Sequence, residues 1–165
     1  MTCAFTGLRE LPLRMIDGDP AYDSLRLRLQ KEITLLCEQG AADFYCGMAL
    51  GADQLCAEIL LDVKREFQEV RLHAAVPFRD QASRWSPTQQ ARYADILGRC
   101  DTVTVLCEEY QKDCCLARNR WMVKRAELLL AVCDPARVPW RSGTGAAVRY
   151  AQARGKGVVL VPPLV

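Results

Sequence analysis

The sequence predicts an α/β fold built on a parallel sheet. Short apolar runs alternate strictly with longer segments of helical periodicity along the whole chain. The short runs are apolar at nearly every position, as is typical of strands that are covered on both faces. Several of the longer segments open on residues that start helices, and this favours helices as the connections between the strands.

The elements of the first half follow from apolar spacing and from helix signals. The first strand ends at Thr6–Gly7. A helix begins at Asp19–Pro20, because Asp caps a helix and Pro suits its first turn, and this helix stops at Gly40. The next three elements are a strand at Asp43–Cys46, a helix from Leu55 to Phe67, and a strand at Val70–Val76 that Pro77 ends.

The second half continues the alternation. Ser86–Pro87–Thr88–Gln89 forms a capping box with Pro at the first helical position, and its helix reaches about Leu97. Strands are expected at Thr102–Cys107, Leu128–Cys133 and Gly157–Val161, and helices at Cys115–Lys124 and from Gly143 to Arg154. This order predicts a single domain over residues 1–165. Its fold class is a Rossmann-like, three-layer α/β/α arrangement with a mostly parallel sheet of about six strands. Such sheets bind ligands at the carboxyl ends of their strands.

Composition and charge limit the range of possible functions. Half of the 165 residues are hydrophobic and a quarter are charged, which is typical of a globular protein, and no apolar run is long enough to cross a membrane. The 22 basic and 20 acidic residues give a net charge of +2, which argues against nucleic acid as a partner. The composition is also compatible with a local basic patch and with a homo-oligomer.

The cysteines favour a reducing compartment. There are nine of them, with no CxxC pair and with a single histidine, His73. We therefore expect no metal site and no cofactor, and we expect reduced thiols in a cytoplasmic protein. Because His73 lies in the middle of a strand, we interpret it as a structural or surface residue.

Three glycine-bearing loops follow expected strands and are candidate anion sites. Gly7 and Arg9 follow the first strand, and Gly47, Gly51 and Asp53 follow the second. A glycine at such a turn lets backbone N–H groups approach a phosphate, and an arginine can clamp it. Asp53 either caps a helix or accepts a hydrogen bond from a ribose hydroxyl.

The third loop, Ser142–Gly143–Thr144–Gly145, carries the strongest local anion signal. Small residues and a hydroxyl precede a helix, whose amino terminus is the positive end of its dipole. We predict that Gly143 and Thr144 bind a phosphate. The alternative is an ordinary turn with a helix cap.

Two further segments supply candidate binding residues. Gln81 and Trp85 follow the third strand, where Trp85 either stacks on a base or covers the end of the sheet. Arg118 and Asn119 lie in the helix after the fourth strand, and they either contact a phosphate and a base or ribose, or form a solvated helix face.

Taken together, these motifs resemble the SLOG superfamily. The segments FTGLR, GMALGADQLCAE, VPF, RNR, SGTG and GKGVVLVPP occur in that order over essentially the whole chain. The chain looks most similar to the YpsA-type branch. The resemblance implies a Rossmann-like fold whose loops bind a nucleotide or a nucleotide-derived ligand. Relatives in the superfamily include phosphoribohydrolases and a DNA-processing protein that loads single strands.

The chain departs from the phosphoribohydrolase pattern at the residue that matters for catalysis. Those enzymes carry a GGxGTxxE motif with a catalytic Glu, and Ala147 stands at the position of that Glu. Leu8 and Glu10 replace the usual His and Pro of the first loop. A carboxylate for glycosidic cleavage would have to come from Asp53 or Glu58.

These observations lead to one leading function and two alternatives. We expect binding or sensing of a nucleotide or nucleotide-derived small molecule in a pocket at the carboxyl ends of the strands. The first alternative is an enzyme, a nucleotide N-glycosidase or phosphoribohydrolase. The second is single-stranded nucleic-acid binding, which needs a basic groove with stacking aromatic residues.

Overall fold

The computed structural model describes residues 1–165 and contains one six-stranded sheet. All neighbouring strands are parallel, in the order β4-β3-β2-β1-β5-β6. The strands are β1 (Thr2–Gly7), β2 (Asp43–Cys46), β3 (Arg71–Phe78), β4 (Thr102–Cys107), β5 (Leu128–Val132) and β6 (Gly157–Leu160). The expected Rossmann-like fold is confirmed, and the sheet is parallel throughout.

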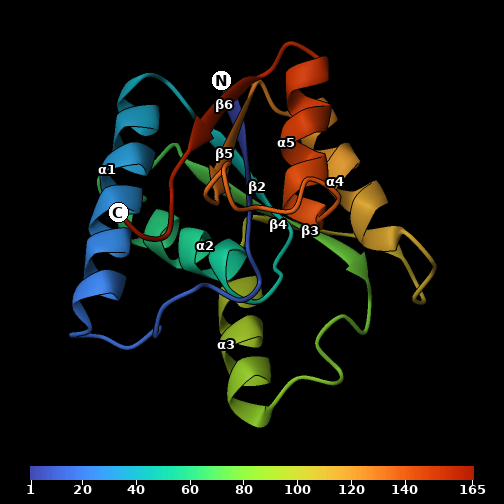
Figure 1. The fold of residues 1–165 in the computed structure, drawn as a ribbon. Helices are drawn as coiled ribbons and strands as arrows, with labels where there is room; N and C mark the ends of the chain where they lie inside the picture. The colour runs from blue at the N-terminus through green and yellow to red at the C-terminus, as the bar shows by residue number, and fades with distance from the viewer.

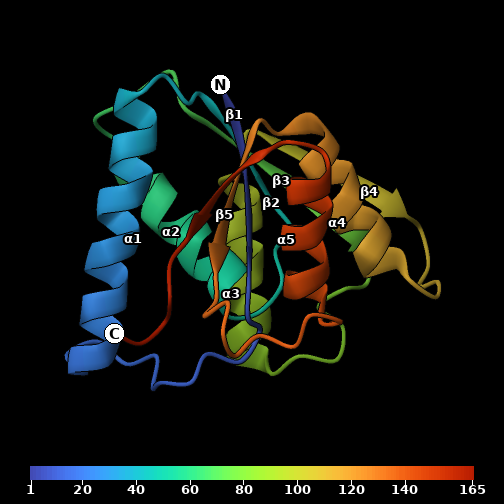
Figure 2. The ribbon, with the colours of Figure 1, turned by 45° about the horizontal axis from the view of Figure 1, so that its top comes forward.

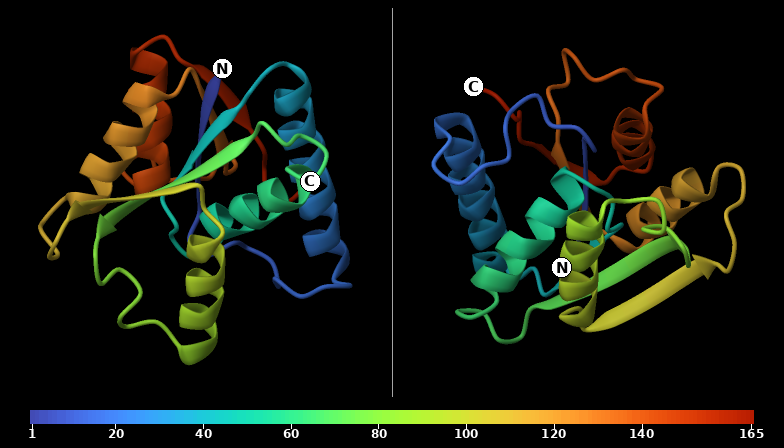
Figure 3. Two further views of the ribbon diagram at one scale, coloured as in Figure 1. Left: turned by 180° about the vertical axis from the view of Figure 1, so that it is seen from behind. Right: turned by 90° about the horizontal axis from the view of Figure 1, so that it is seen from below.

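Five helices form the two outer layers. They are α1 (Pro20–Glu38), α2 (Ala52–Val63), α3 (Pro87–Gly98), α4 (Cys114–Arg125) and α5 (Gly143–Ala153). Helices α1 and α2 lie on one side of the sheet, and α4 and α5 lie side by side on the other (Figures 1 and 2). The view from behind shows the same division (Figure 3). None of the helices combines the length and hydropathy needed to cross a bilayer.

The chain reverses its direction of travel across the sheet once. From β1 it moves outward through β2 and β3 to β4, and it then returns to place β5 on the other side of β1. The carboxyl ends of β1 and β5 therefore mark the switch point, where the connecting segments leave in opposite directions. Open α/β sheets bind ligands at this position.

The two faces of the sheet bury cores of different size. Alternate residues of β1 serve opposite faces, so that Phe5 packs under α1–α3 and Ala4 packs under α4–α5. The first core has 29 buried residues, including Phe5 stacked on Phe44 with ring centres 5.5 Å apart. The second has eight and is built largely from Ala. Small side chains bring α4 and α5 close to the sheet.

The predicted helix starts are confirmed in detail. The Asp19 carboxylate accepts a hydrogen bond from the N–H of Ala21 at 3.0 Å. In the capping box, Ser86 Oγ accepts from the N–H of Gln89 at 3.2 Å, and Gln89 Oε1 accepts from the N–H of Ser86 at 3.0 Å. Two reciprocal bonds of this kind satisfy donors that the first helical turn leaves free.

Two of the predicted element ends differ from the structure for identifiable physical reasons. Helix α2 ends at Val63 rather than Phe67, because the chain tightens into turns in which each N–H bonds three residues back. Strand β3 continues through Pro77 to Phe78. Its pairing with β2 ends at Ala74, so β3 has no partner on that side at Pro77, which lacks an N–H.

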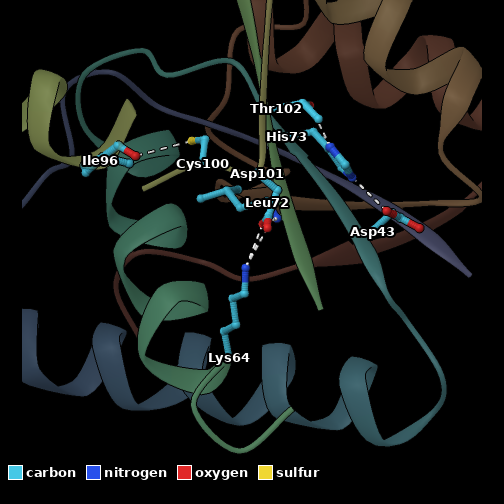
Figure 4. Close-up of polar contacts among 8 residues, drawn as sticks. All are labelled: Asp43, Lys64, Leu72, His73, Ile96, Cys100, Asp101 and Thr102. Atoms are coloured by element: carbon cyan, nitrogen blue, oxygen red, sulfur yellow. Dashed lines mark hydrogen bonds and ion pairs between the residues drawn. The ribbon is translucent and has the colours of Figure 1, made fainter. Parts of the chain in front are cut away.

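Polar side chains join the amino ends of the strands, at the opposite edge from the switch point (Figure 4). The His73 ring lies between Asp43 of β2 and Thr102 of β4, with both nitrogen–oxygen distances 2.7 Å. Nearby, Lys64 Nζ donates to the two Asp101 carboxylate oxygens at 2.7 and 2.9 Å, and the N–H of Leu72 donates to Oδ2 at 2.8 Å. His73 is therefore structural, as its position in a strand predicted.

We expect Asp101→Asn to lower the free energy of unfolding by about 1 kcal/mol at pH 7, which is the size of a partly exposed charge-assisted interaction. Burial raises the pKa of Asp101, but the Lys64 and Leu72 donors outweigh burial and lower it below 3.8. A lowered pKa stabilises the fold above the ordinary pKa of Asp and ceases to do so as pH falls through the lowered value. Urea unfolding at pH 7 and pH 3 should therefore show a difference that shrinks with acid; a difference independent of pH would contradict this assignment.

Candidate functional site

A cavity of about 240 Å³ lies at the switch point. Its wall is made by the segment after β1, by the loop before α2 and by the amino-terminal turns of α4 and α5. The lining residues are Thr6, Gly7, Leu8, Arg9, Ala49, Asp53, Cys115, Leu116, Arg118, Asn119, Ser142, Gly143 and Thr144. We call this space the switch-point cavity.

The amino terminus of α5 presents free backbone donors to the cavity. Ser142 caps the helix, with its Oγ accepting from the N–H of Gly145 at 3.1 Å. The N–H groups of Gly143 and Thr144 have no partner within the chain. Residues of the first turns of α2 and α4 line the same cavity, so three helix amino termini converge on it. Such an arrangement favours an anion.

Arg118 forms the floor beneath this site. Its Nη1 donates to the carbonyl oxygens of Gly47 at 2.5 Å and Ala75 at 3.3 Å, and its Nε donates to Asn119 Oδ1 at 2.8 Å. Strand β2 has ended at this level, so the guanidinium fills the position that β2 would otherwise occupy beside β3. The side chain is only 3% exposed. The interpretation of Arg118 as part of a solvated helix face is therefore wrong.

The glycines of the 47–51 loop shape the backbone rather than line the cavity. A Cβ on Gly47 would collide with the Arg118 guanidinium, and one on Gly51 would collide with the carbonyl oxygens of Leu8 and Arg9. Gly51 also adopts a φ of +79°, which favours glycine. Between them, buried Met48 has a φ of 59°, a conformation that costs about 1–3 kcal/mol in a residue with a side chain.

Asp53 is the one acidic side chain on the cavity wall. Its Oδ2 accepts a hydrogen bond from the N–H of Ala49 at 3.2 Å, and no donor of the chain bonds Oδ1. Burial raises the pKa of Asp53, and the positive charges of Arg118 and Arg9 and the Ala49 donor counteract this only in part. Because Gly51 is the cap residue, Asp53 lies in the first turn of α2 instead of capping it.

Arg9 and Cys115 meet at the open side of the cavity. Arg9 is exposed, and its Nη2 lies 3.5 Å from the Cys115 sulfur. Cys115 is half-buried and belongs to the first turn of α4. This weak contact uses one donor of the Arg9 guanidinium and leaves its other N–H groups free at the open side of the cavity.

Gln81 and Trp85 lie beside the switch-point cavity and not within it. They line a space of about 80 Å³ that shares Arg9, Ala49 and Cys115 with that cavity. The same two residues also border an outer hollow of about 650 Å³, whose other aromatic walls are Phe78 and the exposed Tyr110. The three spaces are therefore neighbours along the carboxyl edge of the sheet, with wall residues in common. We call this row of spaces the carboxyl-edge crevice.

Both side chains also have structural partners. Gln81 Nε2 lies 3.4 Å from the carbonyl oxygens of Gly47 and Met48, so it braces the same loop as Arg118. The Trp85 ring packs edge-on against Tyr93 at 5.3 Å. Trp85 is half-buried, which leaves part of its ring facing the crevice.

The structure brings most of the predicted site residues together. Gly7, Arg9, Asp53, Arg118, Asn119, Gly143 and Thr144 line the switch-point cavity, whereas Gly47, Gly51, Gln81 and Trp85 lie behind or beside it. Ligand binding by these residues stays a prediction. Sequence reasoning placed Ser142 in the anion-binding loop but not among the binding residues, and it missed Cys115 as a lining residue.

The other candidate carboxylate lies elsewhere. Both Glu58 oxygens bond Arg92 of α3 at 2.7 Å, across the contact between α2 and α3. Glu58 is not among the cavity residues, so the structure leaves Asp53 as the carboxylate of the site. No group of three or more His, Cys, Asp or Glu side chains is placed to hold a metal ion.

Comparison with known families agrees with the motifs. The family described as the YspA SLOG family, YpsA, matches residues 3–158. The chain belongs to this SLOG family. Its relatives include a UPF0398 protein of Bacillus pumilus, 30% identical over 135 residues, which are 80% of this chain and 73% of that protein. A UPF0398 protein of Bacillus thuringiensis is 24% identical over 134 residues, with 79% and 73% covered.

Solved structures share the SLOG fold. DNA processing protein A from Streptococcus pneumoniae aligns with a TM-score of 0.64 and 18% identity, over 98% of this chain and 50% of that one. The Helicobacter pylori protein of the same name, described in terms of single-stranded DNA binding, aligns with a TM-score of 0.63 and 17% identity. The alignment covers 97% of this chain and 64% of that one. These identities establish a shared fold, and this SLOG chain spans about half to two thirds of those proteins.

We expect Gly47→Ala to lower the free energy of unfolding by about 2–4 kcal/mol, because the new methyl group displaces the Arg118 guanidinium from its carbonyl acceptors. Urea denaturation measures the loss. Gly98→Ala is the matched control: a Cβ there meets nothing within 4 Å, so its stability should equal or slightly exceed that of the wild type. Equal stabilities for the two variants would show that Arg118 does not depend on Gly47.

Proposed function

We propose that the protein binds a phosphate-bearing nucleotide or nucleotide-derived small molecule in the switch-point cavity. One observation carries the proposal: the N–H groups of Gly143 and Thr144 are free and line a cavity that also holds two arginines. Unpaired N–H groups at a helix amino terminus favour an anion, and Arg9 and Arg118 add positive charge. Membership of the SLOG family supports a nucleotide-related ligand.

The carboxyl-edge crevice suggests how the rest of the ligand lies. With the phosphate at α5, the ribose hydroxyls would reach the free Oδ1 of Asp53, which lines the same cavity. The base would extend past Arg9 toward Gln81 and Trp85, where a half-buried indole ring offers a stacking surface. A free nucleobase without a phosphate lacks the interaction that dominates this arrangement.

Asp53 favours a second candidate, an N-glycosidase of the phosphoribohydrolase type. Its raised pKa keeps the carboxyl protonated to a higher pH than a free Asp. Such a group can donate a proton to a departing base while water adds to the anomeric carbon. Retention of both base and ribose phosphate as intact nucleotide after long incubation would exclude this reaction.

The cysteines support a cytoplasmic location. All nine are free, and burial raises the pKa of several, including Cys3 to about 12 and Cys37 to about 11. Buried thiols of raised pKa are poor nucleophiles and behave as small apolar residues. A reducing compartment preserves them in this form.

A thermal-shift panel tests the proposal on the purified protein. The panel holds AMP, ADP and ATP, their guanine and pyrimidine counterparts, NAD, ADP-ribose and inorganic phosphate. A ligand at 100 times its dissociation constant adds about 2.7 kcal/mol to stability, which such a melt resolves. We expect a shift with at least one phosphorylated compound and none with the matching nucleoside. No shift with any compound would contradict the proposal.

We expect Arg9→Ala to weaken binding of the responding nucleotide by about 10-fold or more, because one charge-assisted hydrogen bond contributes roughly 1.5–3 kcal/mol. Isothermal titration calorimetry measures the change. Arg14→Ala, which removes the same charge from an exposed position off the cavity wall, should bind within about twofold of the wild type. If both variants lost the same affinity for the nucleotide, Arg9 would contribute only its charge and not a direct contact with the ligand.

Asp53→Asn should distinguish the contribution of the phosphate to binding affinity from that of the ribose. Removing a negative charge from the cavity should leave the affinity for inorganic phosphate unchanged or higher. The affinity for the nucleotide, relative to phosphate, should fall by about 3- to 10-fold, which is the size of one or two hydroxyl hydrogen bonds. Calorimetry with both ligands tests this, and a parallel change for the two would show that Asp53 does not contact the sugar.

A further inference from the structure

The charge of the chain is strongly segregated along the sequence. Residues 114–156, which include α4 and α5, hold nine Lys and Arg against two Asp and Glu. The rest of the chain holds thirteen against eighteen. Residues 114–156 therefore have a net charge of +7 and the rest of the chain has −5. The overall charge of +2 does not reveal this uneven distribution. Neither α4 nor α5 contains an acidic residue.

Much of this positive charge gathers on the outer layer that α4 and α5 form. The two helices lie side by side on one side of the sheet (Figures 1 and 3). Six cations of this layer are exposed or half-buried: Arg120, Lys124, Arg125, Arg149, Arg154 and Lys156. We call them the basic face. None of the ion pairs of the chain includes a member of the basic face.

Aromatic rings hold several of these arginines in place. The Arg120 guanidinium of α4 lies 5.4 Å from the centre of the Tyr150 ring of α5, and Arg154 lies 4.6 Å from the same ring. The two like charges are therefore at most about 10 Å apart, which is close to the Debye length at 0.1 M salt. An anion bound between them would relieve their mutual repulsion.

Two more arginine–aromatic stacks occur on the same layer. Arg125 lies 3.7 Å from the Trp121 ring centre, and Arg149 lies 3.7 Å from that of Trp140, which is 62% exposed. Guanidinium planes and aromatic rings are the groups on which unpaired bases stack. A surface that combines unpaired cations with such planes fits both the phosphates and the bases of a single strand.

Helix dipoles explain only part of this charge. Lys124, Arg125 and Arg154 lie at the carboxyl ends of their helices, where a cation is favourable. Arg120 and Arg149 lie in the middle of α4 and α5, where the dipole gives no such advantage. Arg149 is half-buried and donates a hydrogen bond to the carbonyl oxygen of Trp140, which accounts for its position. Arg120 is exposed without a carboxylate partner, and a polyanionic ligand would account for it.

We propose that the basic face of α4 and α5 binds single-stranded nucleic acid, separately from the switch-point cavity. Its lysines and arginines contact the phosphate backbone, and its arginine–aromatic stacks support bases. The binding is electrostatic and weakly dependent on sequence. It goes beyond the proposed small-molecule function, because it uses the outer surface of one layer and none of the cavity residues.

Fluorescence anisotropy with labelled 30-mers of deoxythymidine and of uridine tests the proposal at 50, 100 and 200 mM NaCl. The triple variant Arg120→Gln/Lys124→Gln/Arg154→Gln should bind both strands at least 10-fold more weakly than the wild type. The slope of log K against log salt should fall by about 2, since each lost phosphate contact on a single strand contributes about 0.7. The ratio of the two affinities shows whether DNA or RNA is preferred.

A second triple variant serves as the matched control. Lys31→Gln/Arg65→Gln/Arg71→Gln removes the same charge from exposed positions off the basic face and should bind within about threefold of the wild type. Thermal melts of both variants check that they fold. Arg9→Ala should bind the strands like the wild type, which separates this surface from the nucleotide cavity.

Four results would overturn the proposal. They are absence of wild-type binding at 50 mM NaCl, equal losses in the two triple variants, loss of strand binding in Arg9→Ala, and tighter binding to phosphatidylserine vesicles or polyglutamate than to either strand. The third result would place the strand in the cavity. The fourth would identify the basic face as a membrane or protein contact.

Discussion

The buried guanidinium of Arg118 holds together the carboxyl edge of the sheet. It connects α4 to the carbonyl groups of Gly47 and Ala75, at the level where β2 ends and β3 continues. Because Gly47 has no Cβ, the guanidinium can pack directly on the backbone of the loop. The same loop leads to the start of α2, where Asp53 lies on the cavity wall. Arg118 is therefore a structural part of the site, because its guanidinium already bonds to groups of the chain.

Around that anchor, the site is positive for reasons of topology. The chain reverses between β1 and β5, so helices from both layers direct their amino termini to one cavity. Asp53 is buried among these positive groups, and its raised pKa reflects that burial more than its neighbours. The same α4–α5 layer that lends its helix amino termini to the cavity carries the basic face on its outer side. One layer thus offers a small anion site at its edge and a broad cationic surface along its length.

The sequence predicts the fold and the glycine loops well, because these depend on local signals. Asp19 and the Ser86 capping box mark the starts of their helices. The short apolar runs mark the strands that alternate with helices along the chain. The role of Arg118 could not be predicted, because its acceptors lie 43 and 71 residues away along the chain. The prediction that Pro77 ends β3 is wrong because β2 is short. Beside Pro77, β3 has no β2 partner that would need an N–H donor. Net charge is a sum over the chain, so it could not predict that basic residues gather on the α4–α5 layer.

Binding of a phosphate by the free N–H groups at the start of α5 is the proposed basis of ligand recognition. Nuclear magnetic resonance of ¹⁵N-labelled protein tests it directly, in a titration with the nucleotide that responds in thermal melts and with its nucleoside. We expect the amide signals of Gly143 and Thr144 to move with the nucleotide and to stay in place with the nucleoside. Unchanged signals at both residues, or equal movements with the two compounds, would contradict it.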